Sequence, residues 1–339
     1  MKETKVVMVT GGSGFIGSHT IVELLNNNFS VVAVDNFCNS KPYVIDNIKK
    51  ITGKDFRFYN CDLTNLEDLD AIFENEQIDA IIHFAALKSG AESIENPGLY
   101  YHNNIDGLFN LLIEMKKHGV NNIVFSSSAT VYGNDENVPI LENHQIGNVI
   151  SPYGMTKYLG ELLLESSVRQ NKQLNAIALR YFNPIGAHPS GLIGEDSPFN
   201  IPNNLMLYTL KVALGELPQL KVFGNDYNTP DGTGIRDFIH VVDLATGHIA
   251  AINRLSSLKN KYEVYNLGTG NGHSVVEFIE TFERVNKVKV PYIFTGRRPG
   301  DVEKSFACVD RATKYLKWRA THSLEDCVRD SWNFVKTKR

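Results

Sequence analysis

The sequence is poor in cysteine and has no long hydrophobic run. Its 339 residues include four cysteines, and no two of them form a Cys-x-x-Cys pair. This argues against zinc binding and against a secreted disulfide framework, so we expect no metal site and a reducing, cytoplasmic compartment. No apolar stretch approaches the ~18 residues of a membrane span, and residues 1–9 lack the pattern of a secretory signal. We therefore expect neither a membrane anchor nor a targeting segment.

The chain also has no large excess of charge of one sign. Its 34 lysines and arginines nearly balance its 38 aspartates and glutamates, which leaves a net charge of −4. Such a chain has no general attraction for nucleic acid or for an anionic membrane, so any phosphate must be bound by a particular set of residues. Hydrophobic residues make up 42% and charged residues 21%, as in ordinary globular proteins, and the length favours two lobes.

Short β-branched runs alternate with helical stretches in the first half of the chain. The clearest predicted helices cover residues 97–118 and 152–169. Because the strand-like runs are continuously apolar, they are typical of strands that helices cover on both faces. The pattern predicts an α/β fold with a doubly wound parallel Rossmann sheet. Its predicted strands are 5–10, 30–34, 56–60, 79–84, 122–127 and 176–181.

A change of composition after Phe182 indicates a second lobe. Prolines and glycines crowd between residues 183 and 202, and strand-like runs become fewer after them. We expect residues 1–182 to form the first domain, and residues 183–339 to form a second, smaller α/β lobe that is discontinuous. A predicted helix at 243–254 and a predicted strand at 264–267 belong to a segment, near 241–272, that we expect to rejoin the first sheet.

A glycine-rich loop follows the first predicted strand. Residues 10–17 read Thr-Gly-Gly-Ser-Gly-Phe-Ile-Gly, in which Gly11, Gly14 and Gly17 have the spacing of a dinucleotide-binding loop. Glycines let the backbone turn tightly and approach a pyrophosphate, which binds where the N–H groups of a helix N-terminus are free. The alternative is a glycine-rich turn that binds nothing. The position of the loop between a strand and a helix favours a dinucleotide.

Two acidic residues at predicted strand ends bear on the choice of dinucleotide. Asp35 lies 24 positions after Gly11, near the spacing at which a carboxylate binds the hydroxyls of the adenosine ribose. Because Asp35 would repel a 2′-phosphate, we predict NAD and not NADP; alternatively, Asp35 only caps a turn with Asn36. Asp62 follows the third predicted strand and is expected to face the adenine, although acidic residues at strand ends are often merely solvated.

Tyr153 and Lys157 lie four residues apart at the start of a predicted helix, so they share one face. They follow the predicted strand 122–127, whose end runs into the hydroxyl-rich residues 126–130, and ligands bind at such strand ends. Removing a hydride from a carbinol carbon requires a base for the hydroxyl proton, and a free tyrosine, with a pKa of about 10, is too weakly acidic to be ionised. An ammonium about 5 Å away contributes roughly 3 kcal/mol, or about two pKa units, toward phenolate.

We therefore predict that Tyr153 is the catalytic base, that Lys157 lowers its pKa and also binds the nicotinamide ribose, and that Ser128 bridges Tyr153 to the substrate oxygen. The alternative for this pair is a surface tyrosine beside a solvated lysine. The neighbouring hydroxyls of the strand end favour the catalytic interpretation.

Taken together, these motifs resemble the extended short-chain dehydrogenase/reductase family and, within it, the UDP-glucose 4-epimerases. The resemblance covers nearly the whole chain, including the second lobe, and is much more specific than a glycine loop alone. It implies NAD as cofactor, a UDP-hexose as substrate, and the homodimer that is usual in that family. It is carried by residues 35–40, 83–88, 126–133, 180–184, 201–206, 223–227 and 231–240.

The resemblance also implies roles for individual residues, with Tyr153 as the proton acceptor. Arg236 and Arg298 fit on chemical grounds too, because two phosphates in an acidic protein need guanidinium partners, although either arginine alone could form a surface ion pair. Contacts with NAD are implied for Phe15, Ile16, Asp35, Asn36, Asn39, Ser40, Asp62, Leu63, Phe84, Lys88, Asn103, Lys157 and Phe182. Contacts with the UDP-sugar are implied for Ser128, Thr130, Tyr153, Asn183, Asn204, Leu205, Phe223, Arg236, Arg298, Asp301 and Ser305.

The implied reaction is the reversible interconversion of UDP-glucose and UDP-galactose. The C4 carbinol is oxidised to a 4-keto sugar, the sugar rotates, and the hydride returns to its opposite face, so NAD is retained as a cofactor. One alternative is a nucleotide-sugar 4,6-dehydratase, but Val131 and Tyr132 follow Thr130 where that family has an acidic pair. The other is a non-catalytic NAD-binding sensor, which would not need Ser128, Tyr153 and Lys157.

Ser305 bears on the size of the sugar that the pocket admits. In the epimerases that this chain resembles, the fourth residue after the Gly-Asp acid, here Asp301, lies against the C2 substituent of the sugar. A tyrosine there restricts the enzyme to glucose and galactose, and a small residue admits N-acetylated sugars. The resemblance therefore implies that UDP-GlcNAc and UDP-GalNAc are interconverted as well. The alternative is that Ser305 is an ordinary loop residue and Phe306 closes the pocket.

Overall fold

A seven-stranded parallel sheet forms the centre of the computed structural model, which describes residues 5–135, 137–196, 204–298 and 300–338. The strand order is β11-β6-β5-β4-β1-β2-β3, and every neighbouring pair runs parallel. This confirms the predicted α/β fold with a doubly wound sheet, and six of these strands lie within two residues of their predicted ends. The strands are β1 (Val6–Thr10), β2 (Ser30–Asp35), β3 (Arg57–Asn60), β4 (Ala80–His83), β5 (Asn122–Ser128), β6 (Asn175–Tyr181) and β11 (Tyr262–Leu267).

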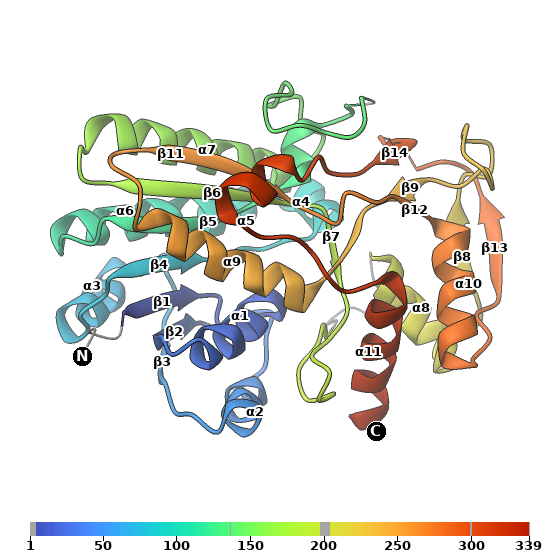
Figure 1. Cartoon of the computed structure of the whole chain (residues 1–339), viewed down its shortest axis with the longest axis horizontal. Helices are drawn as coiled ribbons and strands as arrows, with labels where there is room; N and C mark the ends of the chain where they lie inside the picture. Colours follow the sequence, from blue (N-terminus) through green and yellow to red (C-terminus); the bar gives the residue numbers. More distant parts are fainter. Residues whose placement is uncertain (1–4, 136, 197–203, 299, 339) are drawn as a thin grey trace.

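Helices cover both faces of this sheet, which is why its strands are apolar throughout (Figure 1). Along β1, Val7 and Val9 point to one face and Met8 to the other, and all three are buried. The first face is covered by α1 (Phe15–Asn26), α2 (Tyr43–Thr52) and α9 (Val241–Leu255). The second face is covered by α3 (Leu66–Asn75), α6 (Gly107–Lys117) and α7 (Pro152–Gln170).

The helix predicted at 97–118 forms, but it is not regular. It consists of α5 (Pro97–Tyr101), a π-helical turn η1 (His102–Asp106) and α6. Within η1, the buried Asn104 side chain accepts from Leu87 N at 2.8 Å and donates to Leu87 O at 3.0 Å. The same amide contacts Thr156 Oγ1 of α7 at 3.0 Å. The wider turn thus holds the segment after β4 against α7, and periodicity alone did not predict it.

At one end of the molecule, the described residues form a second group of short strands and three helices, which we call the second lobe (Figure 1). Its core is formed by residues such as Leu210, Val222, Phe278, Phe282 and Val328. Its strands pair as β7 (Asn183–Ile185) with β10 (Phe238–His240), β8 (Leu220–Phe223) with β13 (Tyr292–Thr295), and β9 (Ile235–Arg236) with both β12 (His273–Ser274) and β14 (Lys304–Ser305). Its helices are α8 (Leu205–Ala213), α10 (Val275–Asn286) and α11 (Leu324–Thr337), and the remaining elements of the chain are α4 (Gly90–Glu95), η2 (Ala129–Tyr132) and η3 (Ala312–Leu316).

The helix predicted at 243–254 and the strand predicted at 264–267 are α9 and β11. The strand β11 pairs with β6 over its whole length, from Tyr262 opposite Ala176 to Leu267 opposite Tyr181. The chain therefore returns to the first sheet after it has entered the second lobe. Across the described ranges, we find no helix that combines the length and the apolar character needed to span a membrane.

Candidate active site

The glycine loop joins β1 to α1 and leaves the N-terminus of α1 open. Gly11 has a φ of +69°, and a Cβ atom at Gly17 would collide with the backbone oxygen of Gly11. Gly14 is the N-cap residue, and in the described structure no side chain caps this helix and no acidic residue lies in its first turn. The free N–H groups and the positive end of the helix dipole form a site for an anion such as a pyrophosphate, so these residues fit NAD.

Asp35, the last residue of β2, lies beside this loop. Its carboxylate accepts hydrogen bonds from Ser13 N at 3.0 Å, from Phe37 N at 2.8 Å and from Ser40 Oγ at 2.9 Å. Asp35 therefore connects the glycine loop to the turn after β2, and its bond to Phe37 N is the turn contact that we considered as the alternative. With the carboxylate held next to the loop, the predicted contact with the ribose stays compatible with the turn contact.

Asp62 lies at the next strand end and is already hydrogen-bonded. It accepts from Asn36 Nδ2 at 2.9 Å, from Thr64 N at 2.9 Å and from Thr64 Oγ1 at 2.7 Å. Burial would raise the pKa of Asp62, but the hydrogen bonds from Thr64 and Asn36 lower it below its usual value. The carboxylate is thus ionised at neutral pH and fixes Asn36, and its predicted contact with adenine stays a prediction.

The predicted catalytic residues lie together at the end of β5 and the start of α7. Ser151 caps α7 by accepting from Gly154 N at 3.2 Å, which fixes the helix turn that carries Tyr153. Lys157 Nζ lies 5.8 Å from the centroid of the Tyr153 ring and donates to Ser126 O at 2.8 Å. A hydrogen bond also joins Ser128 to Tyr153. This is not a surface tyrosine beside a solvated lysine, because Lys157 is buried.

The expected lowering of the Tyr153 pKa by Lys157 is wrong for the protein groups alone. Burial raises the pKa of Tyr153 to about 12, and only the hydrogen bond from Ser128 acts in the opposite direction. Burial also lowers the pKa of Lys157 to about 7, so its ammonium is itself only partly charged at neutral pH. The estimate made from the sequence left out the cost of burying either charge. A further positive charge beside Tyr153 is needed to make it a base.

The remaining residues predicted to bind the cofactor lie along the same edge of the sheet. Phe84 follows β4, Phe182 follows β6, and the backbone of Ala85 approaches Gly11 closely. Because the carboxyl ends of parallel strands meet at one edge, the structure brings these residues together with Asp35 and Ser128. Phe15 and Ile16 begin α1, Asn39 and Ser40 lie in the turn after β2, Leu63 follows β3, and Asn103 lies in η1, where its amide donates to Asn104.

Lys88 is engaged with the second lobe. Its Nζ donates to Glu195 Oε1 at 2.6 Å and lies 5.8 Å above the ring of Phe15. The other oxygen of Glu195 accepts from Asn204 Nδ2 at 2.8 Å. Glu195 thus joins a residue predicted to bind NAD to one predicted to bind the substrate. Sequence reasoning missed Glu195, because a single acidic residue in a loop carries no periodic or motif signal.

Sequence reasoning also missed Glu161, which connects α7 to the sheet. Glu161 is buried in α7 and forms an ion pair at 2.7 Å with the equally buried Arg180 of β6. Glu161 also accepts from Ser127, while Arg180 donates to Tyr132 at 2.9 Å. These bonds tie α7 to β5 and β6. Glu161 lies four residues after Lys157, so the helical spacing of the two residues was the signal that could have found it.

The residues predicted to bind the sugar nucleotide gather around β9 and β14. Ser305 pairs with Arg236 in the parallel register of these strands, so their side chains point to the same face. Arg236 forms an ion pair with Asp301. Arg298 lies with its guanidinium carbon 3.9 Å from the centroid of the Phe223 ring. Although Arg298 is exposed, its partial desolvation lowers its pKa. The nearby Asp301 carboxylate raises that pKa, and the nearby Arg236 guanidinium lowers it.

Four other predicted contacts lie where the two lobes adjoin. Asn183, which is exposed, begins β7 directly after Phe182, and Thr130 is exposed in η2 near Gly154 of α7. Asn204 caps α8 by accepting from Leu207 N at 2.8 Å, and Leu205 is the first residue of that helix. Residues 201–203, which belong to one of the motifs behind the resemblance, lie outside the described residues.

Comparison with known proteins agrees with this geometry. Residues 7–268 match the model of the NAD dependent epimerase/dehydratase family. The chain belongs to this family. It is 50% identical over 328 residues to the UDP-glucose 4-epimerase of Bacillus subtilis (strain 168), which covers 97% of this chain and 96% of that protein.

Two solved structures are also similar over nearly their whole length. The UDP-glucose-4-epimerase of Stenotrophomonas maltophila, with bound NAD and formylated UDP-arabinopyranose, has a TM-score of 0.96 and 45% identity, covering 99% of each chain. The UDP-glucose 4-epimerase of Bifidobacterium longum, in complex with NAD+ and UDP, has a TM-score of 0.93 and 45% identity, covering 98% of each chain.

Proposed function

We propose that the protein interconverts UDP-glucose and UDP-galactose by inverting C4, with NAD as a retained cofactor. The observation that carries the proposal is the placement of Tyr153, Lys157 and Ser128 at the sheet edge that also carries the glycine loop. A base for a carbinol proton thus lies next to a site for a dinucleotide. The 50% identity to an epimerase over almost the full length supports the same reaction.

In the proposed mechanism, Tyr153 removes the proton from the O4 hydroxyl, and Ser128 donates a hydrogen bond that holds O4 against Tyr153. Bound NAD would supply an acceptor for the C4 hydride, a donor that returns it to the opposite face of C4, and the positive charge of the oxidised nicotinamide ring. Tyr153, which is half-buried, requires that charge, because desolvation raises its pKa to about 12. Lys157 positions the nicotinamide ribose. Tyr153 keeps the proton taken from O4 and gives it back to that oxygen when the hydride returns to C4.

In this proposal each lobe binds a different molecule. Residues 1–182, joined by the returning segment near 241–272, bind NAD, and the second lobe binds the UDP-sugar. Arg236 and Arg298 bind the diphosphate, with Asp301 orienting Arg236 through its ion pair. Phe223, Asn183, Asn204 and Leu205 complete the pocket. UDP stays fixed while the 4-keto sugar rotates, which is why anchoring groups far from C4 are needed.

We also propose that the pocket admits UDP-GlcNAc and UDP-GalNAc. Ser305 shares a face with Arg236, whereas Phe306 lies near Gly272 on the other side of the strand. Phe306 is therefore poorly placed to close the pocket, and a serine leaves room for an acetamido group. Replacing Ser305 by Tyr is expected to abolish the activity on UDP-GlcNAc and to preserve that on UDP-glucose. A parent protein that is inactive on UDP-GlcNAc would contradict this part.

The dehydratase alternative has little support in the residues after Thr130. Val131 and Tyr132 are buried, and Tyr132 donates to Asn266 Oδ1 at 2.6 Å, so they serve as core. No carboxylate stands at this position to eliminate water. Incubation with UDP-galactose distinguishes the candidates. An epimerase forms UDP-glucose without added reductant, a dehydratase forms a dehydrated keto sugar, and a sensor forms no product.

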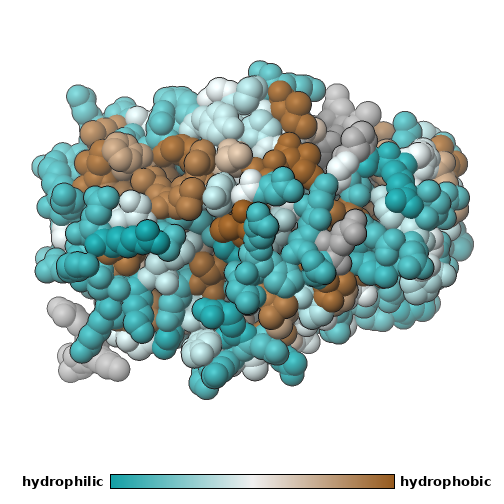
Figure 2. All heavy atoms as spheres, turned by 90° about the horizontal axis from the view of Figure 1, so that it is seen from above, coloured by the Kyte–Doolittle hydropathy of each residue, from teal (hydrophilic) through white to brown (hydrophobic). Residues whose placement is uncertain are grey.

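We further propose a homodimer in the cytoplasm. Large apolar side chains are exposed on α5, α6 and α7, and Figure 2, which looks down on this side of the molecule, shows apolar side chains gathered there. Such a patch is typical of an interface. The change Phe109→Glu is expected to shift the protein from dimer to monomer in sedimentation equilibrium. The exposed residues are Leu99, Phe109, Ile113, Leu159 and Leu162.

A further inference from the structure

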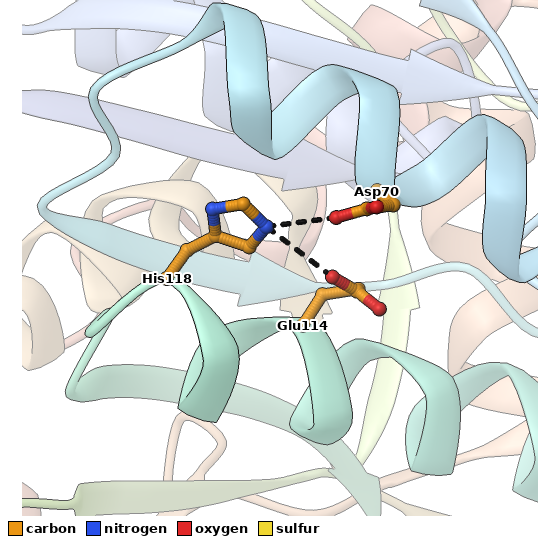
Figure 3. A group of neighbouring side chains, drawn as sticks. All are labelled: Asp70, Glu114 and His118. Atoms are coloured by element: carbon orange, nitrogen blue, oxygen red, sulfur yellow. Dashed lines mark hydrogen bonds and ion pairs between the residues drawn. The ribbon is translucent and has the colours of Figure 1, made fainter.

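A cluster of three metal-ligand side chains lies between α3 and α6, away from the catalytic edge. Figure 3 shows Asp70 of α3 pointing toward Glu114, in the last turn of α6, and toward His118, the C-cap residue of that helix. His118 Nε2 lies 2.8 Å from Asp70 Oδ1 and 3.4 Å from Glu114 Oε2. All three potential ligand atoms lie within 4.8 Å of one another. Ligands of a tetrahedral zinc ion, at about 2.0–2.2 Å from the metal, lie about 3.3–3.6 Å apart, so little movement is required.

Glu114 is the observation that points to a ligand. Its residue is 2% exposed, and its Oε2 atom makes no hydrogen bond within the described part of the chain, although it points into the cluster. A buried carboxylate oxygen without a partner is costly. Two carboxyl groups that face each other in this way need a proton or a cation between them.

Lys117 is the cation that competes for this position. Its Nζ lies 2.5 Å from Asp70 Oδ1 but 3.8 Å from Glu114 Oε2, so it neutralises Asp70 and leaves Glu114 Oε2 with His118 Nε2, at 3.4 Å and not hydrogen-bonded, as its nearer neighbour. Half of the Lys117 side chain is exposed, so it can turn into solvent without loss of packing. Asp70 and His118 are also partly exposed, which leaves a path for an ion from solvent. The C-terminal end of α6 adds the negative end of a helix dipole.

We propose that Asp70, Glu114 and His118 bind a divalent transition-metal ion, with zinc as the best match. One imidazole and two carboxylates suit zinc better than magnesium, which prefers oxygen ligands in an octahedron. On binding, the ion replaces the Nε2 proton of His118 and the ammonium of Lys117. From the absence of a Cys-x-x-Cys pair we expected no metal site, and this proposal departs from that expectation because the absence of such a pair bears only on cysteine ligands. Because α6 ends at the sheet edge opposite the catalytic residues, the ion fastens α3 to α6 and takes no part in the reaction.

The test is zinc binding by the full chain after treatment with a chelator, followed by calorimetry with zinc chloride. We expect one bound zinc ion per chain. Glu114→Gln and His118→Gln should each weaken binding by at least about tenfold, since each removes one of three ligands. Lys117→Met should tighten it, because the competing cation is gone.

His273→Gln is the matched control. His273 and Glu277 also form an ion pair one helical turn apart, at 2.8 Å, but the cluster of Asp70, Glu114 and His118 is the only three-ligand group found in the described ranges. This change should leave the zinc affinity unaltered. A cobalt spectrum without a thiolate charge-transfer band excludes binding at cysteine. Equal zinc affinity in the parent and in both ligand variants, or no stoichiometric binding by Lys117→Met, would overturn the proposal. If Glu114→Gln fails to fold, His118→Gln carries the test.

Discussion

The edge that carries the glycine loop and the region that carries Arg236 are built in different ways. At the first, parallel strands of four to seven residues end side by side, and backbone groups and Asp35 form the site. At the second, strands of two residues hold Arg236 and Ser305, and charged side chains pair with one another. A site built from backbone is fixed by the fold. The second site is built from side chains, and we expect these side chains to change partners when a ligand binds.

The difference also explains what each region can do. A cofactor that is retained through the reaction suits the rigid edge, because the glycine loop needs no rearrangement. A substrate whose sugar rotates while its diphosphate stays bound suits side-chain clamps. The four predictions below change residues on either side of this comparison.

Tyr153→Phe should have the largest effect. It deletes only the oxygen that exchanges the proton, so turnover should fall by about 10²–10⁴-fold while NAD stays bound. Steady-state turnover and the nucleotide released on denaturation measure the two quantities. Tyr158→Phe, five residues further along the same helix, is the control and should retain activity. Near-parental turnover of Tyr153→Phe would remove this residue from the mechanism.

Lys157→Met should change the pH dependence of stability. Burial lowers the pKa of Lys157 from 10.5 to about 7, so between these values the unfolded chain binds a proton that the folded chain lacks. The cost of burying the ammonium is complete below pH 7 and disappears as the pH rises to about 10.5. The free energy of unfolding of the variant minus that of the parent should therefore be larger at pH 7 than at pH 10, by about 3 kcal/mol. Urea unfolding of nucleotide-free protein measures it, and a difference that does not vary with pH would contradict the burial argument.

Arg236→Met should weaken substrate binding with little effect on NAD. The loss of one charged hydrogen-bonding partner of a diphosphate is worth about 10–100-fold in KM. Arg297→Met is the matched control, because Arg297 pairs with Asp226 at 2.8 Å and stacks on Tyr227. Initial-rate kinetics with UDP-galactose separate KM from kcat. Equal effects of the two arginine changes would show that the Arg236 assignment is wrong.

Asp35→Ala should have the smallest effect, about tenfold on NAD affinity, and should narrow the preference for NAD over NADP. The carboxylate both binds ribose hydroxyls and repels a 2′-phosphate. Binding of the two dinucleotides by nucleotide-free protein measures the ratio, with Asp62→Ala as the comparison. An unchanged ratio in Asp35→Ala would leave Asp35 with only its turn contact to Phe37.

Much of the first lobe could be predicted because its signals are local. Its motifs are a strand followed by a glycine loop and a helix, and a tyrosine four residues before a lysine. Each motif lies within a short stretch of sequence, so its spacing alone predicts which residues lie together. The π-helical turn at Asn104 was missed, since it depends on hydrogen bonds to Leu87 and Thr156. The prediction that Lys157 lowers the pKa of Tyr153 was wrong, because burial raises this pKa and burial depends on the whole fold.

The second lobe could be assigned only through resemblance. Arg236 and Asp301 are 65 residues apart, and neither lies in a periodic pattern that predicts their ion pair. Glu195 likewise meets Lys88 across 107 residues. Such contacts join residues that are far apart in the sequence, and they depend on the tertiary structure of the loops. No spacing pattern in the sequence predicts them.

The central claim is that the C4 hydride leaves and returns within one active site whose cofactor stays bound. The most direct measurement uses UDP-galactose labelled with deuterium at C4, incubated with purified protein in ordinary water without added nucleotide. We predict UDP-glucose that keeps the whole label at C4, as measured by mass spectrometry and NMR. Loss of the label to water, or a requirement for added NAD in every turnover, would contradict the account.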